Sequence, residues 1–127
     1  MLRVIIAGSR DFTDKEYAKN ILDKAFSKHR PDSIVCGMAK GADTVGYEYA
    51  KENKIRIDKY PADWNRLGKS AGYSRNVQMA QNAEALVAFW DGESRGTRHM
   101  INIARDMGLK IIVCKYKENK IYTVRQR

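Results

Sequence analysis

The sequence has few of the residues on which several classes of protein depend. Its 127 residues include only 2 cysteines, 2 prolines and 2 histidines. Two distant cysteines form no disulfide framework, which excludes a small disulfide-rich secreted protein. His29 and His99 lack metal-ligand spacing to Cys36 and Cys114, so we expect no metal site. The longest apolar runs, such as Ala85–Trp90, are far shorter than the roughly 18 residues of a membrane span, so we expect no membrane contact.

Targeting and disordered segments are also missing from the sequence. The first seven residues are too short for the apolar core of a secretory signal and include Arg3, so we expect a cytoplasmic protein. With 43% hydrophobic and 31% charged residues, the composition is that of a folded soluble protein. The length favours one domain that spans residues 1–127.

Three common catalytic or cofactor motifs do not occur. The sequence has no G-x-S-x-G, and no G-x-G-x-x-G follows the first apolar run, so we expect neither that serine-hydrolase motif nor a bound nicotinamide cofactor. Residues 68–70 (GKS) end like a phosphate-binding P-loop, but Asp63 stands where that motif requires a glycine. We therefore expect no cofactor and no P-loop nucleoside triphosphatase.

Positive charge is abundant and unevenly distributed. The formal net charge is +9, and most of it belongs to residues 65–127. This bias favours an anionic partner, either a phosphorylated small molecule or a nucleic acid. The alternative is that the charge serves solubility and ends in a basic tail.

Short apolar segments alternate with segments of helical periodicity along the chain. Strands are predicted near residues 2–7, 33–36, 55–60, 85–90 and 110–114, with a short extra edge strand at 120–124. The intervening segments are predicted to be helices, and residues 61–72 form the longest irregular stretch. This alternation predicts an α/β fold, a single Rossmann-like three-layer domain with a mainly parallel sheet. With the first strand central, the strand order is 3-2-1-4-5, and a ligand binds where the winding reverses.

The loop after the fourth predicted strand has the residues of a phosphate site. Ser94 and Thr97 carry hydroxyl groups, Gly96 permits close approach to the backbone, and a helix begins there. The free N–H groups at a helix start favour bound anions. The alternative is that Ser94 or Thr97 only caps the helix.

The loops after the first two strands also carry glycines and cationic side chains. The residues that we expect to contact a ligand there are Gly8, Ser9, Arg10, Gly37, Lys40, Gly41 and Asp43. Arg10 suits a bidentate contact to phosphate or carboxylate, unless it pairs with a neighbouring aspartate. Asp43 either faces the ligand or complements the dipole of the helix that follows.

The third loop supplies an aromatic wall and further charge. Trp64 and Tyr73 offer stacking surfaces for a base, and Arg66, Lys69 and Arg75 add charge. The competing interpretation makes Trp64 part of a small core at the sheet end. We place His99 on the exposed face of the fourth predicted helix, and we interpret both cysteines as small core residues.

Taken together, these loops resemble a known family. The segments that carry the resemblance are residues 8–12 (GSRDF), 37–43 (GMAKGAD), 60–64 (YPADW), 72–79 (GYSRNVQM) and 89–97 (FWDGESRGT). They are similar to the SLOG-type Rossmann-like domains of the YspA-like group, found in bacteria and phages. The wider superfamily includes the cytokinin-activating nucleoside-monophosphate phosphoribohydrolases and the DNA-processing protein DprA.

The resemblance implies binding of a nucleotide or a nucleotide-derived ligand. In the phosphoribohydrolases a P-G-G-x-G-T-x-x-E motif binds phosphate and supplies a glutamate for cleavage of the base–ribose bond. Here residues 94–97 match the phosphate part, but Met100 occupies the glutamate position. Arg75 resembles the active-site arginine of those enzymes, and Asn76 replaces their usual lysine. Without that glutamate, Asp11, Asp43, Asp91 or Glu93 would have to supply the carboxylate. The leading catalytic candidates are Arg75, Asp43 and Asp91.

Three functional hypotheses follow. A nucleotide-binding domain either hydrolyses the N-glycosidic bond of its ligand or acts as a non-catalytic sensor or sequestering module. The alternative from a different class is DprA-like binding of single-stranded DNA through the basic C-terminal half, above all residues 95–127. Because so small a domain forms only a shallow crevice, we also expect a homo-oligomer that completes the pocket.

Overall fold

A six-stranded, mainly parallel sheet is the framework of the computed structural model, which describes residues 1–124. The strands are β1 (Arg3–Gly8), β2 (Ser33–Cys36), β3 (Arg56–Lys59), β4 (Ala85–Trp90), β5 (Lys110–Lys115) and β6 (Lys120–Val124). Their order is β3-β2-β1-β4-β5-β6, and only β6 is antiparallel to its neighbour. The predicted order and the extra edge strand are confirmed.

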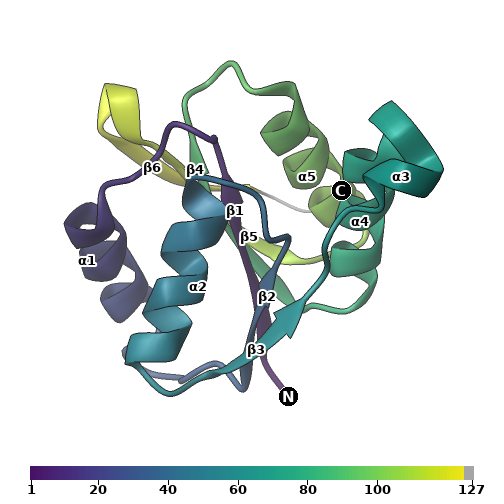
Figure 1. Ribbon diagram of the computed structural model, residues 1–127. Coiled ribbons are helices and arrows are strands. Elements are labelled where there is room, and N and C mark those ends of the chain that lie inside the picture. The colour runs from purple at the N-terminus through teal and green to yellow at the C-terminus, as the bar shows by residue number, and fades with distance from the viewer. Residues whose placement is uncertain (125–127) are drawn as a thin grey trace.

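Helices cover both faces of the sheet. They are α1 (Lys15–Ala25), α2 (Ala42–Glu52), α3 (Trp64–Leu67), α4 (Ala71–Gln81) and α5 (Arg95–Asp106), with short 3-10 turns η1 (Gly68–Ser70) and η2 (Tyr116–Glu118). In Figure 1, α1 and α2 lie on one side of the sheet, and α4 and α5 lie on the other. This is the three-layer Rossmann-like arrangement that the alternating pattern predicts.

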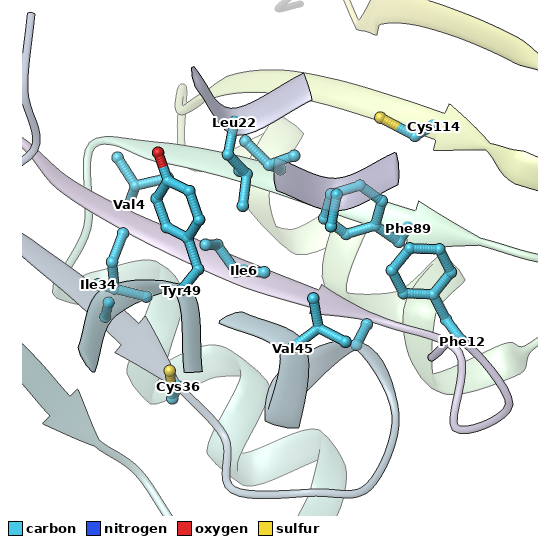
Figure 2. Close-up of a cluster of buried hydrophobic side chains, with 14 of the residues drawn as sticks. Val4, Ile6, Phe12, Leu22, Ile34, Cys36, Val45, Tyr49, Phe89 and Cys114 are labelled. Carbon is cyan, nitrogen blue, oxygen red and sulfur yellow. The ribbon is translucent and has the colours of Figure 1, made fainter. Parts of the chain in front are cut away.

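Alternation along β1 divides the core between the two faces. Val4 and Ile6 pack in one cluster with residues of α1 and α2, and Figure 2 shows both among its side chains. Ile5 and Ala7 belong to a second cluster with residues of α4 and α5. Because successive strand residues point to opposite faces, a central strand buried on both sides needs an uninterrupted apolar sequence.

Both cysteines lie in the first cluster, where they are fully buried. Cys36 ends β2, and Cys114 is the fifth residue of β5. Burial raises the pKa of the Cys36 thiol to about 12, so the group stays protonated near neutral pH. The interpretation of both residues as core is confirmed.

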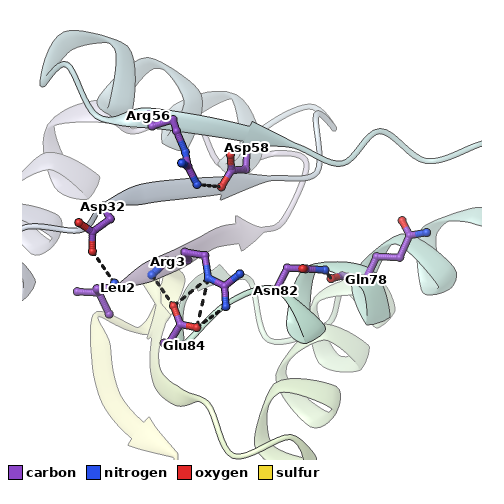
Figure 3. Close-up of polar contacts among 8 residues, drawn as sticks. All are labelled: Leu2, Arg3, Asp32, Arg56, Asp58, Gln78, Asn82 and Glu84. Carbon is purple, nitrogen blue, oxygen red and sulfur yellow. Dashed lines mark hydrogen bonds and ion pairs between the residues drawn. The ribbon is translucent and has the colours of Figure 1, made fainter.

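Charged side chains close the sheet at the end where β1 begins. The Arg3 guanidinium donates to both carboxylate oxygens of Glu84, and the Arg3 backbone N–H donates to Glu84 Oε1 at 2.7 Å (Figure 3). Glu84 precedes β4, so this contact joins the starts of two neighbouring strands that lie far apart in the sequence. The opposite end of the sheet, where the parallel strands end, carries the loops that follow those strands.

The stretch at residues 61–72 differs from its prediction. It is not irregular throughout, because α3 begins at Trp64, η1 follows, and α4 starts at Ala71. The Asp63 carboxylate accepts a hydrogen bond from the Arg66 backbone N–H at 3.1 Å and so caps α3. A four-residue helix is too short to leave a periodic pattern, which is why the sequence does not predict it.

The basic C-terminal region is only partly described. Lys115 forms an ion pair with Glu118 at 3.0 Å, so part of the positive charge of this region is compensated within it. Residues 125–127, which complete the basic segment predicted to bind nucleic acid, lie outside the described residues. That interaction and the homo-oligomer stay predictions. Within residues 1–124, no helix has the length and apolar character to cross a membrane.

Candidate functional site

A cleft opens at the carboxyl ends of the strands, next to the point where the winding reverses between β1 and β4. Its volume is about 240 Å³. Loops that follow β1, β2 and β4 contribute to it, together with α4 and the starts of α2, α3 and α5. The predicted residues that line it are Gly8, Arg10, Asp43, Trp64, Arg75, Asn76, Ser94, Gly96 and Thr97.

The first turn of α5 forms one wall of the cleft. Ser94 caps the helix, because its hydroxyl oxygen accepts from Thr97 Oγ1 at 3.1 Å and from the Thr97 N–H at 3.4 Å. Within residues 1–124, no group accepts a hydrogen bond from the N–H of Arg95 or Gly96. These two donors and the positive end of the helix dipole are therefore available to an anion.

The loop before α5 is held by a network that makes Asp91 a structural residue. Asp91 Oδ1 accepts from the backbone N–H groups of Glu93 and Ser94, each at 2.8 Å, and the Asp91 N–H donates to Ser9 Oγ at 3.0 Å. Burial alone would raise the pKa of Asp91, but these hydrogen bonds outweigh it and hold the pKa below its usual range. Asp91 does not line the cleft.

Trp90 supports the same loop from the end of β4. Its indole N–H donates to the carbonyl oxygen of Ser94 at 3.1 Å. The Arg98 guanidinium and the Lys115 ammonium lie over the ring, at 5.6 and 5.7 Å from its centroid. Cation–π contacts of this kind fix the ring and, through it, the residue that caps α5.

Two glycines allow the first two loops to pack against each other and the sheet. A Cβ on Gly8 would overlap the carbonyl oxygen of Phe89 in the neighbouring strand. Gly41 has a φ of +79°, and a Cβ there would overlap the carbonyl oxygens of Ser9 and Arg10. Gly41 and the buried Ser9 thus lie behind the cleft and shape it without lining it. Only glycine combines this φ with so close an approach.

Arg75 reaches from α4 to the loop after β2. Its Nη1 donates to the carbonyl oxygen of Gly37. A Cβ on Gly37 would lie 2.6 Å from Arg75 Nη1 and 2.9 Å from Asp43 Oδ2, so this glycine makes room for both charged groups. Arg75 Nε is buried and has no hydrogen-bond partner within the described residues.

Asp43 is the only carboxylate among the described residues that line the cleft. It is 6% exposed, and its Oδ2 accepts from the Ala39 N–H at 3.1 Å. Burial raises the pKa of Asp43 to about 6, although the Ala39 hydrogen bond and the charge of Arg75 act in the opposite direction. A carboxyl group with such a pKa exchanges a proton near neutral pH, as general acid–base chemistry requires.

Asn76 and His99 connect α4 to the start of α5. The Asn76 amide nitrogen donates to the carbonyl oxygen of Gly96 at 3.2 Å and lies 3.1 Å from His99 Nδ1. The Tyr73 ring meets the His99 ring edge to face at a centroid distance of 4.5 Å. Burial lowers the pKa of His99, so its neutral form is favoured. The predicted exposed position of His99 is therefore wrong: it lies between two helices.

Aromatic rings stand at the mouth of the cleft. Trp64 is 51% exposed, which contradicts the alternative that it belongs to a small core. Its ring lies next to Gly72, where a Cβ would be 3.5 Å from the indole, an ordinary van der Waals contact. Tyr73 is exposed as well and also lines the cleft. Both rings have faces available for stacking.

The floor of the cleft is apolar. Met79 and Met100 line it, and both side chains are almost fully buried. Met100 stands where the phosphoribohydrolase motif has its glutamate, so that position supplies no charge. With Asp91 outside the cleft, the catalytic candidates that line it are Arg75 and Asp43.

The remaining predicted residues lie next to the cleft. Gly37 and Lys40 line a neighbouring hollow, which shares Arg10, Ala39, Trp64 and Arg75 with the cleft. The lining residues to which the sequence analysis assigns no role in the site are Ala7, Ala39, Gly72 and Met79. Tyr73, which the sequence analysis names as a stacking surface beside Trp64, also lines the cleft.

The fold and the cleft define a Rossmann-like α/β protein with a cationic cleft at the reversal of strand order. Residues 2–67 match the model of the "YspA, cpYpsA-related SLOG family". The chain is also 34% identical over 121 residues to the Gene 61 protein of Mycobacterium phage D29, covering 88% of this chain and 95% of that one. This protein belongs to the YspA, cpYpsA-related SLOG family. No solved structure matches the chain significantly.

Proposed function

We propose that the cleft binds a nucleotide or a nucleotide-derived ligand, with a phosphate group at the start of α5. One observation carries this proposal: the cleft that Arg10 and Arg75 line is also lined by Gly96, in the first turn of α5, where the N–H groups of Arg95 and Gly96 have no acceptor among residues 1–124. Backbone donors at a helix start and arginine side chains are the partners that phosphate prefers in proteins. Family membership is compatible with such a ligand.

The rest of the ligand would occupy the mouth of the cleft. Trp64 and Tyr73 offer exposed aromatic surfaces there, and stacking on such a ring holds a base of any identity. The Asn76 side chain, anchored on Gly96, lies beside the phosphate position and presents its amide to the ligand. This division of roles places phosphate recognition on α5 and base recognition on α3 and α4.

Calorimetry with nucleoside 5′-monophosphates and the matching nucleosides tests the proposal. We expect at least one monophosphate to bind, and its nucleoside to bind about tenfold more weakly or worse, which corresponds to roughly 1.4 kcal/mol. Arg75→Gln should weaken binding by a similar factor. Arg66→Gln is the matched control, because Arg66 carries the same charge on α3 and its side chain pairs with Asp63. Equal affinity for nucleoside and monophosphate, or equal effects of the two variants, would contradict a phosphate site.

Hydrolysis of the N-glycosidic bond is a second candidate function, and the chemistry of Asp43 favours it. Cleavage of that bond needs an acid, a base or a charge that stabilises an oxocarbenium-like centre. The Asp43 carboxyl group, with its pKa raised to about 6, is the group of the cleft that fits this role.

Chromatography for released base distinguishes an enzyme from a sensor. If the protein hydrolyses its ligand, Asp43→Asn should abolish base release while the nucleotide still binds. If the wild type binds a nucleotide and releases no base across the panel, the protein is a binding module, and the hydrolase candidate is rejected.

A further inference from the structure

A second hollow adjoins the cleft on the side of β2 and β3. Its volume is about 680 Å³. Met38 and Lys40 line it from the loop after β2, and Pro61 and Ala62 line it from the loop after β3. It shares Arg10, Ala39, Trp64 and Arg75 with the cleft, so these residues stand between two parts of one depression.

The size of the cleft indicates that its ligand extends into this hollow. Ligand sites in proteins usually measure roughly 300–1,000 Å³. The volume of the cleft alone, about 240 Å³, falls below that range. The combined volume of the cleft and part of the hollow lies within it. A ligand larger than the cleft would extend beyond it, and the hollow is the concave surface that adjoins it.

The charges around the hollow favour a second anionic group. Its charged lining residues are Arg10, Lys40 and Arg75, and no carboxylate lines it among residues 1–124. Neither Arg10 nor Lys40 forms an ion pair or hydrogen bond with a described side chain, so neither charge is neutralised by a contact within the chain. Uncompensated cations that converge on a concave surface attract anions.

The loop that carries Lys40 also presents an apolar side chain. Met38 has a φ of +60°, a conformation that residues other than glycine rarely adopt, and its side chain is exposed at the hollow. With Trp64 on the other side, the hollow therefore has apolar contact surface as well as charge. A flat organic group such as a base would find contacts there.

We propose that the cleft and the hollow together bind a dinucleotide, a ligand with two phosphate groups separated by a nucleoside unit. This inference rests on the proposed function, because it takes the first phosphate to lie at the start of α5. The second phosphate lies beside Lys40. Arg10 and Arg75 contact both halves of the dinucleotide, and Trp64 stacks between those halves.

Calorimetry tests the proposal. One pair of ligands is AMP and the 5′-phosphorylated dinucleotide pApA, and a parallel pair is GMP and pGpG. We expect the dinucleotide to bind at least tenfold more tightly than the monophosphate of the same base. Lys40→Ala should reduce that ratio to less than threefold. Lys28→Ala is the matched control, because Lys28 is exposed in the connection between α1 and β2, outside the cleft and the hollow. Its replacement should keep the affinity ratio at tenfold or more.

The outcomes separate the two proposals. A dinucleotide that binds no more tightly than its monophosphate overturns the second site and leaves the first intact. If the affinity ratio stays at tenfold in Lys40→Ala, the second phosphate site is also overturned, because the tighter binding of the dinucleotide then does not depend on Lys40. If no monophosphate and no dinucleotide binds, the proposed function itself fails.

Discussion

Replacing Asp43 with asparagine should stabilise the protein at neutral pH, although Asp43 lies in the candidate site. Asparagine has nearly the same shape, and its carbonyl oxygen still accepts the hydrogen bond from the Ala39 N–H. What the substitution removes is the cost of holding an ionised carboxylate in a buried position.

The pKa gives the magnitude of this effect. The pKa of Asp43 rises from 3.8 to about 6 on folding, so the folded state binds the proton more tightly than the unfolded chain. The contribution of Asp43 to stability is therefore largest below pH 4 and falls as the pH rises from about 4 to 6. A shift of this size corresponds to about 3 kcal/mol, which the wild type loses across that window and Asp43→Asn does not.

Urea unfolding of both proteins between pH 4 and pH 8 measures this difference. Glu84 and Asp91 have lowered pKa values and change stability in the opposite direction, but they are common to both proteins and cancel in the difference curve. We expect the two proteins to be similar near pH 4 and the variant to be more stable by about 3 kcal/mol at pH 7.5. A variant that is less stable at pH 7.5, or a flat difference curve, would refute the assigned environment of Asp43.

Other substitutions test the scaffold around the site. Gly41→Ala should lower the free energy of unfolding in urea by at least about 2 kcal/mol, because its φ of +79° and its contact with two carbonyl oxygens leave no room for a Cβ. Trp90→Phe should cost about 1 kcal/mol in the same assay, since it removes the hydrogen bond to Ser94. Arg3 lowers the pKa of Glu84, so the stability that Glu84 contributes should be lost as the pH drops below about 4.5. The Tm difference between the wild type and Glu84→Gln, measured from pH 6 to pH 3, should therefore shrink as the pH falls.

The fold could be predicted because its signals are local and strong. Buried parallel strands produce short apolar runs, and the first four runs here each end near a glycine or proline that marks the next loop. Strand order follows once the first strand is taken as central, because right-handed crossovers leave few arrangements. The short helix at Trp64–Leu67 escaped prediction because its capping aspartate is followed by only one helical turn.

The site was less accessible to sequence reasoning, for two physical reasons. A loop motif shows which residue types are near a strand end, but not which way their side chains point. Asp43 and Asp91 are equivalent in this respect, yet Asp43 faces the cleft while Asp91 folds back onto its own loop. The contact of Tyr73 with His99 depends on how two helices pack, and neither helix alone reveals it.

The pairing of β1 with β4 affects how the chain must fold as it is made. Val4 lies opposite Ala85, so the central strand leaves the ribosome long before its second neighbour exists. Until then, β1 and β2 hold Ile5, Ala7 and Val35 without the cover of α4 and α5. Pairing between segments so distant in the sequence is slow, and apolar surface exposed meanwhile invites aggregation. We therefore expect the nascent chain to depend on chaperones until β4 has emerged, and rapid synthesis of the last third to favour the native fold.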